Sequence, residues 1–340
     1  MRGRFPAAAL KCALVVILPI LLCSLAGCSK IWSARDERKP PLPSEVRKKS
    51  KSSPPPVNQA LASYAAPARI ALLEDKSVNE SSGVVASRRT AGLFWTHNDS
   101  GDGPYLYAFD RAGRKRGVWR VEGAQARDWE DIAAGPGPSS GRAYLYVADT
   151  GDNDRARAQV TIYRLPEPEV SDADASSDRK NPRPTAAAEA IRLKYPDGRH
   201  DAETLLVHPK TGDLYVVTKD IAVAGIYKLA APFSSKEVNT LARVGELRVP
   251  ALFAGLLTGG DISPDGTRVV LCDYLAAYEL TLPAAAPAGG FDAIWKQTPV
   301  VINLGEREQG EAVCYGADGS SVLATSEKRP APLIEVKRRK

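Results

Sequence analysis

Five times along this chain, an acidic residue stands at the start of a short apolar segment that follows a polar turn. The five acidic residues are Glu80, Glu130, Glu203, Asp261 and Glu311. Their spacing lies between about 50 and 75 residues, a period typical of radial β-repeats with one supersecondary unit per repeat. If each unit is a propeller blade, the five carboxylates converge near one axis. The same period therefore constrains the fold and marks a candidate site.

Each repeat contains short runs of β-forming residues bounded by Gly, Asp, Asn and Pro. The innermost strand of each blade is expected at 81–86, 130–133, 203–207, 261–263 and 312–315. The fifth repeat lacks its fourth strand, and a spare strand is expected at 68–73. Because a ring closes without free edges when its termini share a blade, the sequence predicts an all-β, five-bladed β-propeller whose N-terminal strand closes the last blade. A pair of β-sandwiches is the alternative.

Two insertions interrupt the period. Residues 171–186 are rich in Ser, Asp, Lys, Arg and Pro, and they lengthen the second repeat. Their composition predicts a flexible loop. Residues 284–290 are a similar connector of Ala, Pro and Gly. Neither insertion contains a strand-forming run, so no sixth blade is expected.

The N-terminal region has the composition of an export signal. A basic start and an apolar run over 13–22 precede Leu25-Ala26-Gly27-Cys28, and the run is too short for a stable membrane span. This ending resembles a bacterial lipobox, which implies a lipoprotein signal peptide at 1–27 and a lipidated, palmitate-bearing Cys28. An ordinary secretory signal with a coincidental cysteine is the alternative. We expect an exported protein anchored to the bacterial cell envelope; Ser29 is typical of sorting to the outer membrane in a diderm.

Charge is distributed unevenly along the chain. Residues 28–66 are expected to be a disordered, basic and Pro-rich linker, 67–336 the propeller domain, and 337–340 a basic tail. The net charge of +6 is concentrated in the signal, linker and tail, which leaves 57–336 acidic. An acidic domain lacks the basic surface that nucleic acid requires. We therefore expect a monomer that contacts the membrane through its lipid and binds no nucleic acid.

Two cysteines, Cys272 and Cys314, remain within the expected propeller domain. Both lie in apolar strand patterns, where cysteine usually acts as a small packing residue. We expect two buried free thiols rather than a disulfide.

The five acidic strand starts would lie at one mouth of the propeller axis. Clustered carboxylates repel one another unless a cation or a shared proton compensates. Hard oxygen ligands in this number suit Ca²⁺, so we expect a calcium site formed by Glu80, Glu130, Glu203, Asp261 and Glu311. The alternative is a polar funnel in which the carboxylates cap strand ends and bind water.

A second polar set follows the second strand of each repeat. We expect its members to lie near the same mouth and to contribute to ligand binding: Asp99, Asp149, Asp152, Asn153, Lys219 and Lys328. Asp and Asn are also ordinary turn residues, and the two lysines could simply pair with acidic neighbours. Both alternatives stay open.

Several familiar chemistries find no support in the sequence. The chain has three histidines and no His-x-x-x-His or Cys-x-x-Cys pair, which argues against zinc. It also lacks a Gly-x-Ser-x-Gly nucleophile motif. His200 could serve as a general base near Glu203, but a surface histidine in a turn is the favoured explanation.

The strand-start and turn motifs resemble those of a group of exported bacterial propeller proteins of unassigned activity, over about residues 70–336. The motifs that carry this resemblance are 79–83, 97–101, 128–131, 149–153 and 201–203. One carboxylate per inner strand is also similar to β-propeller phytases and five-bladed calcium-activated apyrases, which hydrolyse phosphate groups with Ca²⁺ near the axis. The likeness to apyrases implies metal-binding roles for Glu130, Glu203 and Glu311. Glu80 and Asp261 depart from that pattern, which tends to have Ser there.

Together these observations predict a cell-envelope lipoprotein that acts as a binding or scaffold module with a calcium site. Its ligand at the mouth could be a small molecule, a glycan or a protein. The alternative function is a calcium-dependent phosphohydrolase, and the sequence leaves open whether the chain is an enzyme.

Overall fold

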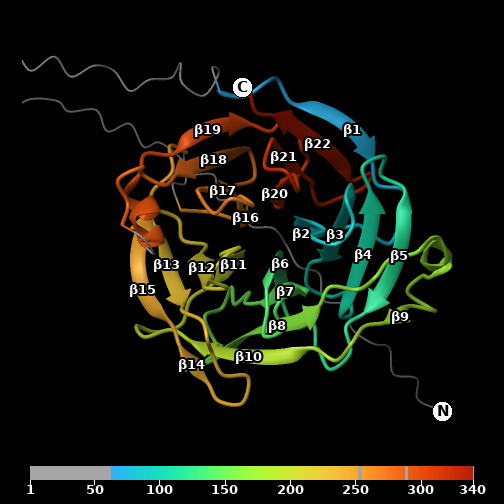
Figure 1. The fold of residues 1–340 in the computed structure, drawn as a ribbon, viewed down its shortest axis with the longest axis horizontal. Helices are drawn as coiled ribbons and strands as arrows, with labels where there is room; N and C mark the ends of the chain where they lie inside the picture. Colours follow the sequence, from blue (N-terminus) through green and yellow to red (C-terminus); the bar gives the residue numbers. More distant parts are fainter. Residues whose placement is uncertain (1–62, 252–254, 288–289, 340) are drawn as a thin grey trace, which may run out of the picture. The chain divides into compact units, whose positions relative to one another are not determined.

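The computed structural model describes residues 63–251, 255–287 and 290–339, and this part of the chain is nearly all β. Its strands form five sheets arranged in a ring around one axis (Figure 1). In each sheet, the first three strands from the axis outward follow sequence order and are antiparallel. The short outer strands β9 (Arg183–Pro184) and β14 (Asn239–Thr240) pair parallel with their neighbours. The predicted five-bladed β-propeller is confirmed.

The blades are numbered in chain order. Blade 1 contains β2 (Ser81–Ala86), β3 (Leu93–Asn98), β4 (Tyr105–Asp110), β5 (Lys115–Arg120) and β9 (Arg183–Pro184). Blade 2 contains β6 (Trp129–Pro136), β7 (Ala143–Asp149), β8 (Val160–Pro166), β10 (Glu189–Lys194) and β14 (Asn239–Thr240). Blade 3 contains β11 (Ala202–Val207), β12 (Leu214–Thr218), β13 (Ala224–Leu229) and β15 (Ala242–Leu247).

The last two blades follow the same order. Blade 4 contains β16 (Gly259–Ile262), β17 (Arg268–Cys272), β18 (Ala276–Thr281) and β19 (Val300–Asn303). Blade 5 contains β20 (Val313–Tyr315), β21 (Ser321–Ala324), β22 (Pro332–Lys337) and, on its outer edge, β1 (Ala68–Leu72). The innermost strands are thus β2, β6, β11, β16 and β20, close to the ranges expected from the sequence.

The ring is closed by β1, the first strand of the described chain. It pairs antiparallel with β22, so that Ala68 lies opposite Glu335 and Leu72 lies opposite Pro332. This pairing covers the edge of the last blade, which would otherwise expose unpaired backbone groups. The predicted closure is confirmed.

Apolar side chains from neighbouring blades form the core between them. Blades 1 and 2, for example, bury Trp95, Trp119 and Trp129 together, and the rings of Trp95 and Trp119 meet edge to face with centroids 4.9 Å apart. Cys272 and Cys314 are both buried and free, as the sequence predicted. Their positions in β17 and β20 make them packing residues between blades 4, 5 and 1.

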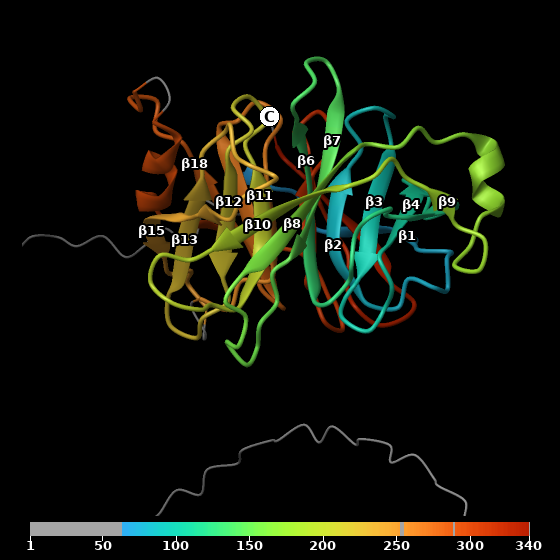
Figure 2. The ribbon, with the colours of Figure 1, turned by 90° about the horizontal axis from the view of Figure 1, so that it is seen from below.

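The insertion at 171–186 is ordered, which corrects the expectation of a flexible loop in blade 2. It forms the 3₁₀ helix η1 (Asp172–Ser176) and the short strand β9, which pairs parallel with β5 of blade 1 (Figure 2). The hydroxyl of Ser177 accepts a hydrogen bond of 2.8 Å from the amide of Val118. Backbone hydrogen bonds to blade 1 therefore order this segment despite its polar composition. A second 3₁₀ helix, η2 (Phe291–Lys296), packs Phe291 and Trp295 against Tyr215.

The propeller begins earlier and ends later than the sequence suggested. Tyr64, which was assigned to the linker, is buried, and its hydroxyl donates a hydrogen bond of 2.6 Å to Glu279. It also pairs with Arg338, and Lys337 belongs to β22, so these two residues of the expected basic tail are part of the fold. Cys28, the signal segment 1–27 and the linker up to residue 62 lie outside the described residues. No helix within the described ranges is long and apolar enough to cross a membrane.

Candidate metal centre at the mouth of the propeller

We call the end of the ring at which the inner strands begin the mouth. There, in four of the blades, an amide after the second strand donates a hydrogen bond to a carbonyl that precedes the adjoining inner strand. The donors are Asp99, Gly151, Lys219 and Glu327, and the acceptors are respectively Glu80, Asp128, Asp201 and Gln309, at 2.8–3.3 Å. The acceptors are equivalent positions, and the strand register makes Asp99, Thr150 and Lys219 equivalent in blades 1 to 3.

A β-bulge follows in blades 1 to 3 and defines a second set of equivalent positions. The register shifts between Ser81 and Gly83, between Trp129 and Asp131, and between Ala202 and Thr204. The extra residue of a bulge is unpaired and its side chain is re-aimed. The bulged residues are Ser82, Glu130 and Glu203. In blade 5 the same place, two residues after Gln309, is taken by Glu311.

Thr258 takes this place in blade 4. Its hydroxyl donates a hydrogen bond of 3.1 Å to the carbonyl of Glu311 in blade 5, just as the hydroxyl of Ser82 donates one of 2.7 Å to the carbonyl of Glu130 in blade 2. The ring of equivalent side chains at the mouth is therefore Ser82, Glu130, Glu203, Thr258 and Glu311. Three of the five predicted metal ligands, Glu130, Glu203 and Glu311, belong to this ring. The other two, Glu80 and Asp261, do not.

Asp261 lies deeper along its strand than the ring. Its side chain is 3% exposed and accepts hydrogen bonds from the amides of Ile262 at 2.8 Å and Tyr315 at 3.0 Å. Burial raises the pKa of Asp261 to about 6. The carboxylate of Asp261 therefore joins blade 4 to blade 5 and is not part of the ring of side chains at the mouth. Glu80 belongs to the acceptor set and is half-buried at the rim.

The structure brings five carboxylates together at the mouth on the side of blades 1 to 3. Asp99, Asp128 and Glu130 form one group of three, and Glu130, Asp201 and Glu203 form another. Within each group, one carboxylate oxygen from every residue lies within 4.8 Å of the others. Glu130 belongs to both groups and is 4% exposed. We call these five residues the mouth cluster.

Asp128 and Asp201 were not among the predicted ligands. Each precedes a ring glutamate by two residues, so an Asp-x-Glu spacing occurs in blade 2 and again in blade 3. This repeated spacing was the signal that could have identified both aspartates.

Proximity and burial raise the proton affinity of the cluster. Burial, and then the charges of Glu203, Asp99 and Asp128, raise the pKa of Glu130 well above its ordinary value. Burial also raises the pKa of Asp99 to about 6 and raises that of Asp128. Like charges held this close need protons or a cation to compensate them.

Two of the three ring glutamates have a partner of their own. In blade 3, the ammonium of Lys219 forms an ion pair with Glu203 and lies 5.3 Å from the ring centroid of Tyr274. Although burial opposes it, the carboxylate of Glu203 raises the pKa of Lys219 above its ordinary value. In blade 5, the amide of Gln309 donates to both Glu311 and Glu327. Burial and the neighbouring Glu311 raise the pKa of Glu327 to about 9.

Glu130 lacks such a partner. Among the residues that the structure describes, no side chain or amide donates a hydrogen bond to its carboxylate, and no basic group forms an ion pair with it. The position in blade 2 equivalent to Lys219 is Thr150, whose hydroxyl donates a hydrogen bond of 2.7 Å to the carbonyl of Ala202. Gly151 follows it. A Cβ atom at Gly151 would lie 2.0 Å from Oε1 of Glu130 and 2.5 Å from Oδ2 of Asp128. Glycine is thus what lets these two carboxylates occupy this space.

The other predicted ligand residues are engaged in their own loops or exposed. Asp149 pairs with Arg157 at 2.9 Å, and Asp152 accepts from the amides of Ala156 and Arg157 at 2.8 Å. Asn153 is exposed in the same turn. Lys328 is exposed and pairs with Glu308 at 3.6 Å. Of the six residues predicted for ligand binding, the mouth cluster and its ion pair involve Asp99 and Lys219.

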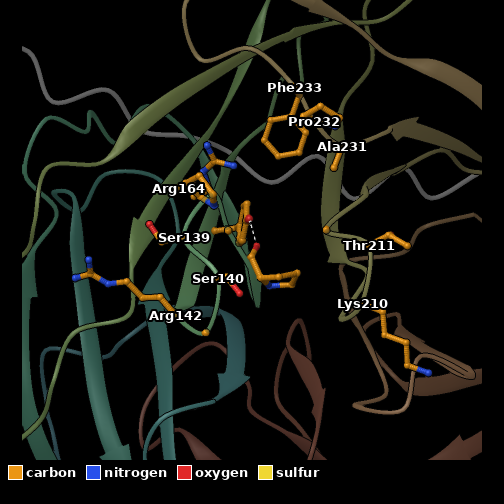
Figure 3. Close-up of a pocket in the computed structure, with 15 residues that line it drawn as sticks. Ser139, Ser140, Arg142, Arg164, Lys210, Thr211, Ala231, Pro232 and Phe233 are labelled. Atoms are coloured by element: carbon orange, nitrogen blue, oxygen red, sulfur yellow. Dashed lines mark hydrogen bonds between the residues drawn. The ribbon is translucent and has the colours of Figure 1, made fainter.

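A hollow of about 480 Å³ lies at the opposite end of blades 2 and 3. It is lined by the loop 136–142, by 210–212 and by 231–233. Its basic side chains do not converge: Arg142 and Lys210 point away from each other in Figure 3. The guanidinium of Arg164 lies over the ring of Phe233 at 5.1 Å and pairs with Glu189. The hollow therefore presents no assembled set of polar ligands.

Asp131, directly after Glu130, fills the axis below the cluster. Its carboxylate accepts hydrogen bonds from the amides of Leu205 in blade 3 at 3.0 Å and Gly260 in blade 4 at 3.3 Å. This side chain therefore joins the inner strands of blades 2, 3 and 4 next to the mouth cluster.

Comparisons with known proteins add little to this geometry. No family model matches the chain, and no curated protein matches it. Among solved structures, the chain is similar to hydrazine synthase from Kuenenia stuttgartiensis, with a TM-score of 0.39 and 11% identity, over 76% of this chain and 71% of that one. The fold and the site define the chain as a five-bladed β-propeller with an acidic mouth whose carboxylate groups could hold a metal ion.

Proposed function

We propose that the chain is a cation-binding propeller module and that its mouth cluster binds Ca²⁺. The observation that carries the proposal is Glu130, a buried carboxylate without a donor or basic partner among the described residues, which lies between two carboxylate groups. Burying an uncompensated charge is costly. A divalent cation would remove that cost and the mutual repulsion of the five carboxylates.

The chemistry of the donors favours calcium over transition metals. Both groups consist of carboxylates alone, and hard oxygen ligands suit Ca²⁺, Mg²⁺ or Mn²⁺, whereas imidazole and thiolate suit zinc and copper. Ca²⁺ accepts about six to eight oxygens in flexible geometry, while Mg²⁺ demands a nearly ideal octahedron. The ligands come from three blades, and two of them are only half-buried. Ca²⁺, which accepts irregular coordination, fits this arrangement better than Mg²⁺ does.

We further propose that the module acts by binding rather than by catalysis, on the bacterial cell envelope. An ion bound in the mouth cluster would have coordination positions open toward solvent for a small molecule, a glycan or a protein. Cys28, outside the described residues, would carry the lipid that anchors the chain. A Cys28→Ser variant that still fractionates with membranes would contradict this anchor.

A second candidate is a calcium-dependent phosphohydrolase. The observation that favours it is Lys219, whose ammonium lies beside Glu203 of the cluster and could neutralise a phosphate bound to the ion. A metal ion could then orient a water for attack. Calcium-dependent release of phosphate from nucleotides or inositol phosphates, lost in Glu203→Gln, would support this function. Equal phosphate release with and without calcium would sink it.

The central test is calcium titration of the full-length protein by calorimetry, with magnesium as the competing ion. Glu130→Gln removes one charge at nearly constant volume and should weaken calcium binding by at least about tenfold, or 1.4 kcal/mol. Glu237→Gln, an exposed site in a distant loop, is the matched control and should bind as wild type does. A wild-type melting temperature that does not change with calcium would overturn the proposal, because an ion bound to the native state must raise it.

A further inference from the structure

We infer that Lys219 is a built-in cation that limits the mouth to one exogenous divalent ion, held at the Glu130 end of the cluster. This inference rests on the proposed calcium binding and adds to it the number of ions and the residue that sets it. Lys219 and Gly151 are its structural basis.

Lys219 and Thr150 occupy equivalent positions in adjacent blades, because Thr218 pairs with Ala202 directly before Lys219 and Asp149 pairs with Trp129 directly before Thr150. Gly151 follows Thr150. The carbonyl of Asp201 accepts from the amide of Lys219 at 2.9 Å, and that of Asp128 accepts from the amide of Gly151 at 3.3 Å. Two residues after each acceptor comes the ring glutamate of the blade, Glu203 or Glu130. Blades 2 and 3 therefore repeat one arrangement of aspartate and glutamate, and they differ in the residue that follows the second strand, Thr150 or Lys219.

The difference determines which glutamate lacks charge compensation. In blade 3, the Lys219 ammonium contacts Glu203, and the Tyr274 ring lies 5.3 Å from it on another side. In blade 2, the hydroxyl of Thr150 donates to the carbonyl of Ala202 at 2.7 Å, and the carboxylates of Glu130 and Asp128 occupy the space that a Cβ at the next residue, Gly151, would need. Lys219 places a cation beside Glu203, whereas Glu130, 4% exposed and without a partner among the described residues, is the counterpart without one.

Two consequences follow from Coulomb's law in a site of low dielectric. An ion at Glu130 retains Asp99, Asp128 and Asp201 as ligands while Lys219 holds Glu203. A second divalent ion at Glu203 would have to displace the lysine or lie within a few ångströms of its charge. Lys219 therefore excludes the second ion, and its charge also lowers the affinity for the first ion by repulsion.

The test is calcium titration by calorimetry of the full-length wild type, Lys219→Met and Lys219→Arg. Methionine keeps most of the length without the charge, and arginine keeps the charge. We expect one ion for wild type and for Lys219→Arg. We expect either a second ion for Lys219→Met, or a single one bound at least about tenfold more tightly, which is about 1.4 kcal/mol. Lys219→Gln, read in the same way, replaces the methionine variant if that variant does not fold.

Each outcome separates this inference from the proposed function. If Lys219→Met has the stoichiometry and Kd of wild type, the lysine inference is overturned while calcium binding stands. If wild type binds no calcium and Lys219→Met binds it, the lysine inference is upheld and the proposed function of the natural chain is overturned. Binding by none of the proteins overturns both.

Discussion

The carboxylate of Asp131 in blade 2 accepts a hydrogen bond of 3.3 Å from the backbone amide of Gly260 in blade 4, across the axis of the ring. The same carboxylate accepts one of 3.0 Å from Leu205 in blade 3. Asp131 is fully buried, and blades of a propeller otherwise meet mainly through apolar contacts. One side chain thus ties three inner strands together directly below the mouth cluster and keeps their spacing fixed.

We predict that Asp131→Ala lowers the free energy of unfolding by about 2–4 kcal/mol, because it leaves buried amides without acceptors. Asp131→Asn keeps one acceptor oxygen and should cost less. Urea denaturation measures both changes, with exposed Asp154→Ala as the control expected to stay within about 0.5 kcal/mol of wild type. An alanine variant as stable as the control would show that the inter-blade hydrogen bonds contribute nothing.

The cluster also predicts how stability depends on pH. Burial and neighbouring charges raise the pKa of Asp99 to about 6 and of Glu327 to about 9, and raise that of Glu130 well above its ordinary value. The folded protein therefore binds more protons than the unfolded chain between about pH 6 and pH 9, and its stability falls as pH rises through this window.

Thermal melting at a series of pH values in chelator checks this prediction. We expect the melting temperature to fall by several degrees from pH 6 to pH 9. Calcium should reduce the fall, since it replaces the lost protons. Glu327→Gln should flatten the upper part of the curve. A melting temperature that rises over this window without calcium would mean that these carboxylates are compensated in another way.

The fold was predictable because propeller blades repeat their strand pattern. Ser81–Ala86 was expected with the bounds it has, since apolar runs between turn residues leave few alternatives. The strand β9 was missed, because its pairing with β5 depends on a neighbouring blade and its own sequence, around Arg183–Pro184, is not strand-forming.

The candidate site was predictable only in part, because its register depends on bulges. Glu130 and Glu203 both sit at a register shift, whereas Asp261 lies in a regular ladder and turns its carboxylate into the fold. A bulge changes which way a strand residue faces, and a single sequence does not show where it occurs. The pairing of Lys219 with Glu203 could not be distinguished beforehand from a free ligand-binding lysine.

Tyr64 gives a test of where the domain begins. Its hydroxyl donates to Glu279, which also accepts from Tyr315 and Arg268. We predict that Tyr64→Phe lowers the free energy of unfolding by about 1 kcal/mol through the lost hydrogen bond. Tyr64→Ala should cost about 3–5 kcal/mol through the cavity it leaves. Urea denaturation of full-length variants measures both, and an alanine variant equal to wild type would place residue 64 back in the linker.

Gly151 provides a prediction about binding that involves no charge. A Cβ at this position would lie 2.0 Å from Oε1 of Glu130 and 2.5 Å from Oδ2 of Asp128, so Gly151→Ala must push both carboxylates aside. We predict that it weakens calcium binding by about tenfold or more, because metal affinity depends on holding several ligands at once.

The control for Gly151→Ala is Asn153→Ala, an exposed change two residues along the same turn. It should bind calcium as wild type does in the same calorimetric titration. Melting in chelator separates a binding defect from unfolding: Gly151→Ala should retain most of its stability without calcium but lose most of the increase that calcium gives. If both variants bind with the wild-type Kd, the cation does not lie between Glu130 and Asp128, and the centre must be sought nearer Glu203.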